Sequence, residues 1–287
     1  MTLMNYNMGN MGNMGNMGLA ISSSQGPYPS SSLPFGDALT HDGLLPPELD
    51  QPPESGARLP FEILHGAKYP FAVWDPSYRA LAVLAEFAAG PWPKLIDAAD
   101  PVPSHFGIES FEQTAAHEIP ILRQYAAVHR ARRLAELVAQ ADDARPYWAD
   151  ILLSGPTVRP FTWTLIDIGQ TVGQMVAMHY KAKYNRPRPV QLYPALVPPL
   201  ITPSHPSYPN AHALQSRLMS ECVALATPAH RPVLLALANR VGQNREIAGV
   251  HYPTDRKASI YVAEKVFPEL QTLPMFKEVL RHAKAEW

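Results

Sequence analysis

The strongest chemical signal in the sequence is a cationic segment without acidic residues. Asp and Glu are absent from residues 168–220, although an even spread of the 25 acids over 287 positions would place about five there. The basic residues of this window are Lys181, Lys183, Arg186, Arg188 and Arg217. Prolines after two of the arginines stiffen the backbone, and guanidinium forks with a lysine point charge suit a tetrahedral oxyanion. The segment therefore predicts an anion site.

Two later segments carry groups that fit the same chemistry. Asn210 stands where a helix cap is expected, and the first N–H groups of a helix lack intrahelical acceptors, so they can bind an anion. Asp255 follows His251 by four residues across a predicted helix start. Its carboxylate can accept one ring N–H and leave the other nitrogen as a nucleophile or ligand. Arg245 lies near the end of the preceding predicted helix.

These segments form three blocks in a fixed order. The first is Lys181, six residues, then Arg188-Pro189; the second is Pro209-Asn210-Ala211-His212; the third is Arg245, five residues, His251, three residues, Asp255. The blocks are separated by 19 and 32 residues. Together they resemble the signature of the type 2 phosphatidic acid phosphatase and vanadium haloperoxidase superfamily, although they cover only about a quarter of the chain.

The resemblance implies a role for each block residue. Three side chains would hold the equatorial oxygens of phosphate or vanadate: Lys181, Arg188 and Arg245. His251 would attack phosphorus, or bind vanadium axially, with Asp255 orienting its ring. His212 would serve as acid and base on the leaving group.

The sequence departs from the superfamily pattern at three positions. Asn210 and Ala211 replace the usual Ser and Gly of the second block, and Asn244 replaces the Ser that opens the third. Ala211 keeps the backbone N–H, and an Asn amide can both donate to an oxyanion and cap a helix. Anion binding is therefore expected at Asn210 and Ala211, while the added methyl group can crowd the phosphate.

Three functions follow from this comparison. The first is a phosphatase that hydrolyses phosphate monoesters through a phosphohistidine and requires no cofactor. The second is a vanadate-dependent haloperoxidase that uses hydrogen peroxide and halide, with vanadate held by His251. The third is a degenerate anion-binding or structural protein. Surrounding Lys and Arg residues disfavour a site for metal cations.

The hydrophobic pattern predicts an all-α fold, a single-domain bundle of about eight helices over residues 60–287. Its longest helix is expected from Pro160 to about Tyr184, where Gly169 and Gly173 would permit close helix packing. The other expected helices cover residues 77–89, 110 to the 130s with a kink at Pro120, 145–153, 211–226, 232–248 with Val233, Leu237 and Val241 inward, 253–267 and 272–285. Residues 1–59, with four Asn-Met-Gly repeats, predict a flexible arm.

Several other residues favour structural roles. His205 is expected to pack in a proline-rich loop, although a role as a second proton carrier or as a metal ligand stays open. The cluster of Arg130, Arg132 and Arg133 is interpreted as a solvated surface.

Composition excludes several classes of protein. A net charge of -1 argues against a nucleic-acid-coating protein, and a single cysteine, Cys222, excludes an intrachain disulfide framework. The uncharged residues 189–216 contain seven prolines, so they predict no membrane span. Charged residues make up only 17%, which favours surface buried within the molecule or between subunits of a homo-oligomer. The lack of a recognisable signal peptide favours the cytoplasm.

Overall fold

Helices account for all the regular secondary structure of the described chain. A computed structural model describes residues 66–287, and no strand occurs among them. The predicted arm, residues 1–59, lies outside the described residues. Residues 75–287 form one compact unit, whereas residues 66–74 belong to a second one and contain only a short 3-10 turn, η2, Phe71–Val73. Eight α-helices of the described residues are eleven residues or longer, so the predicted all-α class is confirmed.

Two helices form the centre of the unit. α8 spans Pro160–Tyr184, as predicted, and packs along α10, Ala211–Ala224. A Cβ added at Gly169 would lie 2.3 Å from the backbone nitrogen of Met219, and one at Gly173 would lie 2.9 Å from Cα of Gln215. The predicted close packing at these glycines is confirmed, and it brings the polar residues of both helices into contact.

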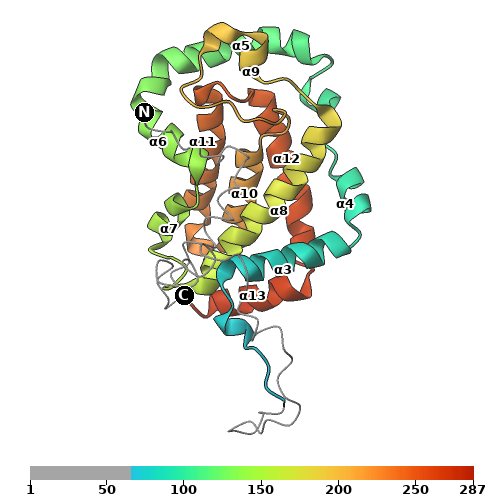
Figure 1. Ribbon diagram of the computed structural model, residues 1–287, viewed down its shortest axis with the longest axis vertical. Coiled ribbons are helices and arrows are strands. Elements are labelled where there is room, and N and C mark those ends of the chain that lie inside the picture. Colours follow the sequence, from blue (N-terminus) through green and yellow to red (C-terminus); the bar gives the residue numbers. More distant parts are fainter. Residues whose placement is uncertain (1–65) are drawn as a thin grey trace, which may run out of the picture. The chain divides into compact units, whose positions relative to one another are not determined.

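The remaining long helices surround this pair (Figure 1). α10 also contacts α11, Arg231–Ala248, and α12, Pro253–Leu270. α3, Pro76–Ala89, and α13, Pro274–Lys284, both pack against α8 and against each other. Apolar side chains of α11 and α12 are buried where these helices pack against α10. This burial holds the end of α11 and the start of α12 in fixed positions.

A long, irregular helical segment crosses the end of the bundle where the three blocks lie. It consists of α5, Phe111–Tyr125, a five-residue π-helical turn η4, Ala126–Arg130, and α6, Ala131–Asp142. The shorter elements are α4, Trp92–Ala98; η3, Pro103–Phe106; α7, Pro146–Leu152; α9, Pro189–Leu192; η5, Pro194–Leu196; and η6, Pro228–His230. None of the helices described is both long and apolar enough to cross a membrane.

Pro120, where a kink was predicted, lies inside α5, which continues to Tyr125, and the π-helical turn begins at the next residue. Two other sequence-based expectations were wrong in detail. Val233 was expected to face inward but is 44% exposed, and its neighbour Leu234 is buried in its place, whereas Leu237 and Val241 are buried as predicted. Arg130 is not a solvated surface residue, because its guanidinium donates to the carbonyl oxygens of Ile247 and Val197 at 3.1 and 2.9 Å.

Candidate active site

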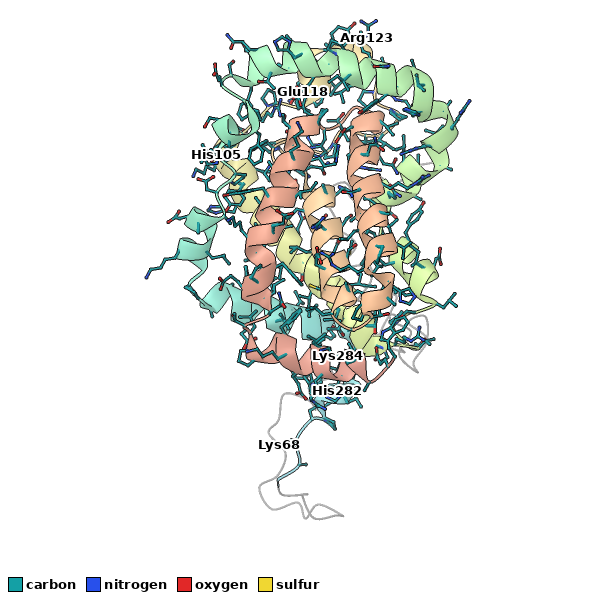
Figure 2. The ribbon with its side chains drawn as sticks, turned by 180° about the vertical axis from the view of Figure 1, so that it is seen from behind. Lys68, His105, Glu118, Arg123, His282 and Lys284 are labelled. Atoms are coloured by element: carbon teal, nitrogen blue, oxygen red, sulfur yellow. The ribbon has the colours of Figure 1, made fainter. Side chains whose placement is uncertain are left out.

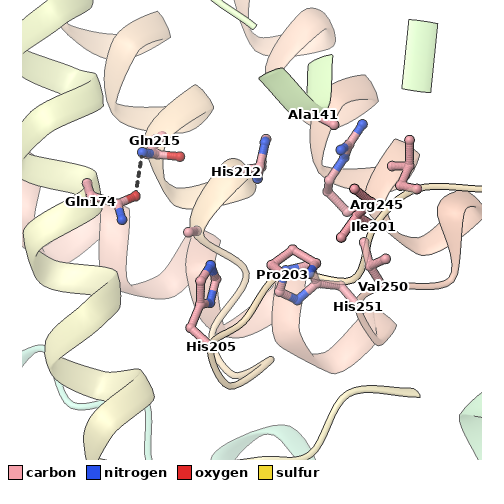
Figure 3. A pocket seen from close by; sticks show the side chains of 12 residues that line it. Ala141, Gln174, Ile201, Pro203, His205, His212, Gln215, Arg245, Val250 and His251 are labelled. Carbon is pink, nitrogen blue, oxygen red and sulfur yellow. Dashed lines mark hydrogen bonds between the residues drawn. The ribbon is translucent and has the colours of Figure 1, made fainter. Parts of the chain in front are cut away.

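One pocket collects residues from the second and third blocks (Figure 3). The second block opens α10, and the third joins the last turn of α11 to the first turn of α12. Of the predicted site residues, Ala211, His212, Arg245 and His251 line the pocket. The first block begins near the end of α8, and its arginine, Arg188, contacts His251, which lines the pocket.

His251 is held between a carboxylate and a guanidinium. Its Nδ1 lies 3.0 Å from Oδ2 of Asp255, and its Nε2 lies 2.9 Å from Nη1 of Arg188. Because the carboxylate accepts the Nδ1 proton and the arginine can only donate, Nε2 carries the lone pair. Burial lowers the pKa of His251 well below its ordinary value, and the charges of Arg188 and Lys181 lower it further. The ring is therefore neutral, with a nucleophilic nitrogen.

A second arginine, Arg186, also binds the carboxylate of Asp255, although the sequence analysis did not assign it a role in the site. Arg186 donates to Oδ1 of Asp255 at 2.7 Å and to Oε2 of Glu118 at 2.9 Å. Glu118 also accepts from the backbone N–H of Thr254 in the first turn of α12. Figure 2 shows Glu118 on the inner side of α5, toward the bundle, with Arg123 on the outer side. A hydrogen-bonded chain from α5 therefore orients Asp255.

The two cations of the first block differ in their placement. Nη1 of Arg188 touches His251, and the same guanidinium nitrogen donates to the carbonyl oxygen of Val250 at 2.7 Å. Lys181 is not among the residues that line the pocket; its Nζ donates to the carbonyl oxygens of Pro206 and Ser207 at 2.6 and 3.0 Å. Burial and the nearby Arg188 hold the pKa of Lys181 well below its ordinary value. An anion bound beside it would favour its charged form.

Arg245 brings a guanidinium into the pocket from the last turn of α11. Its Nη2 donates to the carbonyl oxygen of Leu137 at 2.8 Å, and its Nε is buried without a hydrogen-bond partner among the described residues. Burial lowers the pKa of Arg245 to about 10, so the side chain stays charged at neutral pH. An unpaired buried donor on a cation is a favourable position for an oxyanion oxygen.

His212 lies in the first turn of α10, and α6 determines which of its nitrogens is protonated. Nε2 of His212 lies 3.1 Å from the carbonyl oxygen of Gln140. A carbonyl can only accept, so Nε2 carries a proton and Nδ1 is the nitrogen left for proton transfer. Burial lowers the pKa of His212 well below its ordinary value, and the charge of Arg245 acts in the same direction.

The side chain of Asn210 makes its hydrogen bonds within the fold. Its Oδ1 accepts from the backbone N–H of Ala213 at 3.2 Å, and its Nδ2 donates to the carbonyl oxygen of Gly242 at 3.4 Å. The side chain caps α10 and is not among those that line the pocket. Ala211, the next residue, does line the pocket. The second block therefore presents the start of a helix, where unpaired N–H groups favour anions.

Asn244, the other replaced position, connects α11 to α6. Its Nδ2 donates to Oε1 of Glu136 and to Oε1 of Gln140, both at 2.8 Å. Gln140 is also the residue whose carbonyl faces His212. The replacement therefore supports the helix that fixes the His212 ring, and this contact could not be seen in the sequence pattern.

His205 lines the pocket, although the sequence favoured simple packing in the loop. Its Nδ1 lies 3.0 Å from Nη2 of Arg188. Burial, Lys181 and Arg188 lower the pKa of His205 to about 3, so the ring is neutral and accepts from the guanidinium. His205 thus orients Arg188. Among the described residues no group of three or more His, Cys, Asp or Glu side chains could hold a metal ion.

Sequence comparisons give relatives of known activity. A non-specific acid phosphatase of Salmonella typhi is 34% identical over 80 residues, 28% of this chain and 32% of the relative. A non-specific acid phosphatase of Salmonella typhimurium is 29% identical over 136 residues, 46% of this chain and 54% of the relative. A decaprenylphosphoryl-5-phosphoribose phosphatase of Mycobacterium tuberculosis is 31% identical over 111 residues, 38% of this chain and 60% of the relative.

The chain is homologous to these phosphatases. They are members of the type 2 phosphatidic acid phosphatase superfamily, so the resemblance that the three blocks indicated is confirmed. The chain covers between 32% and 60% of the length of these relatives, less than two thirds of each. No protein-family model matches the chain.

Proposed function

We propose that the protein hydrolyses phosphate monoesters through a phosphohistidine at His251. The observation that supports this most strongly is the His251 ring, whose Nδ1 is bound to Asp255 while Nε2 meets Arg188 at 2.9 Å. A neutral imidazole with a fixed tautomer is a nucleophile, and the guanidinium beside it is placed for the oxygens of the group under attack. The homology to phosphatases supports the same reaction class.

In the first step, the Nε2 lone pair of His251 forms a bond to phosphorus and the bond from phosphorus to the ester oxygen breaks. Nδ1 of His212 gives its proton to that oxygen, and the alcohol leaves. Asp255 balances the positive charge that the phosphorylated ring acquires. Arg188, Arg245 and the amides at the start of α10 stabilise the equatorial oxygens, and one such preorganised donor is worth roughly 3 kcal/mol.

In the second step, water attacks the phosphohistidine. Nδ1 of His212, now deprotonated, takes a proton from the water as its oxygen bonds to phosphorus, and the bond between Nε2 and phosphorus breaks. Inorganic phosphate leaves and His251 regains its lone pair. The roles of His212 in the two steps are the reverse of each other, as expected for one proton carrier.

The free protein does not favour a protonated His212, because burial and Arg245 lower its pKa. The negative charge of a bound phosphate ester would raise that pKa, so the substrate itself promotes the acid form of His212. The pKa in the free protein still governs kcat/KM. Activity is therefore expected to be highest at acidic pH.

Vanadate is a similar tetrahedral oxyanion, and the same residues would hold it, with Nε2 of His251 as the nitrogen available to bind vanadium. A vanadate that accepts a fifth ligand resembles the phosphoryl transition state, so we expect vanadate to inhibit the phosphatase more strongly than phosphate does. Oxidation of bromide by peroxide in the presence of vanadate, without hydrolysis of any ester, would support the haloperoxidase alternative instead.

The decisive experiment compares wild type and His251→Ala with 4-nitrophenyl phosphate as the substrate. Wild type should release nitrophenol and phosphate, and the variant should lose at least about 1000-fold in kcat. Phosphate binding, measured by calorimetry, should persist because the cations remain. His105→Ala, an exposed histidine away from the pocket, is the matched control. Undiminished activity in His251→Ala would exclude the proposed nucleophile.

A further inference from the structure

Two glutamines form a wall of the pocket that the phosphate chemistry does not use. Gln174 comes from α8 and Gln215 from α10, and both line the pocket together with His212 (Figure 3). They are 9% and 2% exposed. Nε2 of Gln215 donates to Oε1 of Gln174 at 2.9 Å and to the carbonyl oxygen of Gln170 at 3.3 Å.

These contacts determine which amide atoms of Gln174 and Gln215 remain available to a ligand. The carbonyl oxygen of Gln170 can only accept, so the Gln215 atom that faces it must be the amide nitrogen. That nitrogen in turn requires the oxygen of Gln174 as its second acceptor. The amide nitrogen of Gln174 and the carbonyl oxygen of Gln215 therefore remain, and neither makes a hydrogen bond with another described residue. The wall offers one donor and one acceptor.

The fold holds this pair firmly. A Cβ at Gly173 would lie 2.9 Å from Cα of Gln215, so the backbones of α8 and α10 are in direct contact beside the two amides. Because the backbones cannot move apart without losing this packing, the donor and acceptor keep their places.

The pair lies beside the expected leaving group. Gln215 follows His212 by three residues on α10, so the two side chains share a face, displaced by about 4.5 Å along the helix axis. His212 is the proposed proton donor to the ester oxygen, which places Gln215 next to the first few atoms of the departing alcohol. This placement depends on the proposed phosphatase function.

The chemistry of this wall selects against a second charge. Arg245 is the only Lys, Arg, Asp or Glu among the residues that line the pocket, and neither amide carries a charge. A hydroxyl group both donates and accepts, so it can bond to the Gln174 nitrogen and the Gln215 oxygen. A hydrocarbon chain would leave both amide atoms buried and unpaired, which is costly.

We propose that Gln174 and Gln215 are specificity-determining residues that bind a hydroxyl group of the substrate alcohol. The substrate class is then a phosphate monoester of a polyhydric alcohol, such as a polyol or a sugar, with a free hydroxyl within a few carbons of the ester oxygen.

The test compares ligands that differ only in hydroxyl groups. Propylphosphonate and dihydroxypropylphosphonate cannot be hydrolysed, so their dissociation constants can be measured by calorimetry on the full-length protein. Wild type should bind the dihydroxy compound at least about tenfold more tightly. Gln174→Leu and Gln215→Leu should each reduce that ratio to about twofold or less, with little change for propylphosphonate. Gln243→Leu, on α11 outside the pocket, should keep the wild-type ratio.

The outcomes separate this inference from the phosphatase proposal. Equal binding of both phosphonates by wild type would overturn the hydroxyl site, even if both leucine variants failed to fold. A preference that persists unchanged in the folded variants would also overturn it. Binding with the expected preference, but no hydrolysis of glycerol phosphate or propyl phosphate, would overturn only the phosphatase proposal. Failure to bind either phosphonate would overturn both.

Discussion

His212 and His251 are the same residue type in one pocket, but their neighbours give them different chemistry. Asp255 keeps the proton of His251 on Nδ1, at 3.0 Å, whereas the carbonyl of Gln140 keeps the proton of His212 on Nε2, at 3.1 Å. Opposite ring nitrogens are therefore left unprotonated. In the proposed mechanism, the carboxylate of Asp255 would support the charge that His251 acquires as the nucleophile, and the carbonyl of Gln140 would orient the ring of His212 as it gains and loses a proton.

This difference predicts how the effect of replacing His212 depends on the leaving group. His212→Gln should lower kcat/KM for propyl phosphate by about 100-fold or more, because an alkoxide must be protonated as it leaves. With 4-nitrophenyl phosphate the loss should be much smaller, since nitrophenolate leaves without a proton. Steady-state kinetics on both substrates test this. A loss of equal size on both would mean that His212 only binds the anion.

Glu246, next to Arg245 on α11, should make stability depend on pH. Its Oε1 meets Nε of Arg256 at 2.5 Å, but its Oε2 is buried without a partner among the described residues. Burial outweighs the arginine and raises the pKa of Glu246 to about 7, from 4.5 in an exposed chain. The folded state thus binds the extra proton between these values, and stability falls as the pH rises through this window.

Glu246→Gln should remove this dependence. The free energy of unfolding of the variant, relative to wild type, should rise between pH 5 and pH 8 by on the order of 2 kcal/mol. Urea unfolding at several pH values measures it. Glu109→Gln, at an exposed site, serves as the control and should follow the wild-type curve. A constant difference across this range would contradict the buried, proton-binding carboxyl.

Prediction of the site from sequence reached only residues within the three blocks. The four-residue spacing of His251 and Asp255 was sufficient to place them in contact, because it spans a single helix start. Glu118 lies 68 residues from Arg186 and 136 from Thr254, and no local pattern reports such a contact. Asn210 looked like an anion ligand, but its amide is used within the fold because a helix cap requires its oxygen.

At the scale of elements, the contact between α8 and α10 positions the side of the pocket that Gln174 and Gln215 form. The sequence predicted the bounds of α8 because its apolar stripe is long and continuous. The sequence could not show which of two adjacent apolar residues at the start of α11, Val233 or Leu234, is buried. Only the packed structure shows that it is Leu234. Arg130 was misinterpreted for a different reason: the carbonyl oxygens that accept its hydrogen bonds lie on segments far away in the sequence.

Gly169→Ala should separate α8 from α10. The new methyl group would lie 2.3 Å from the backbone of Met219, and backbone atoms cannot turn away as a side chain can. We expect a loss of about 3 kcal/mol in the free energy of unfolding. Gly155→Ala is the matched control, because a Cβ there meets nothing within 4 Å. Equal unfolding midpoints for the two variants would contradict the close contact.

At the scale of the whole described unit, residues 286 and 287, which follow α13, contact the residues at the start of α8. The Glu286 carboxylate accepts from the backbone N–H groups of Phe161 and Thr162 at 2.8 and 2.7 Å. Arg159 lies over the ring of Trp287, 3.9 Å from its centre. A distant carboxylate thus supplies the cap that the residue before α8 does not provide.

Glu286→Ala should lower stability without altering catalysis. Loss of a charged helix cap costs about 1–2 kcal/mol, or roughly 2–8 °C in Tm for a chain of this size. Gln174, the α8 residue that lines the pocket, lies about 20 Å along the helix from Phe161, so kcat and KM should not change. Thermal unfolding and kinetics measure both. Glu278→Ala, which breaks an exposed ion pair with Arg281, should have little effect on either.

The hydrogen bond between Arg188 and His251 has a consequence for reactivity in the absence of an oxyanion. Electrophiles such as acylating reagents attack imidazole at an unprotonated nitrogen, and here that nitrogen faces a guanidinium N–H at 2.9 Å. Only a ligand that draws Arg188 toward its own oxygens frees the lone pair, and that ligand then stands directly in front of it. In the proposed mechanism, selective attack on phosphorus would thus begin with protection of His251 from other electrophiles.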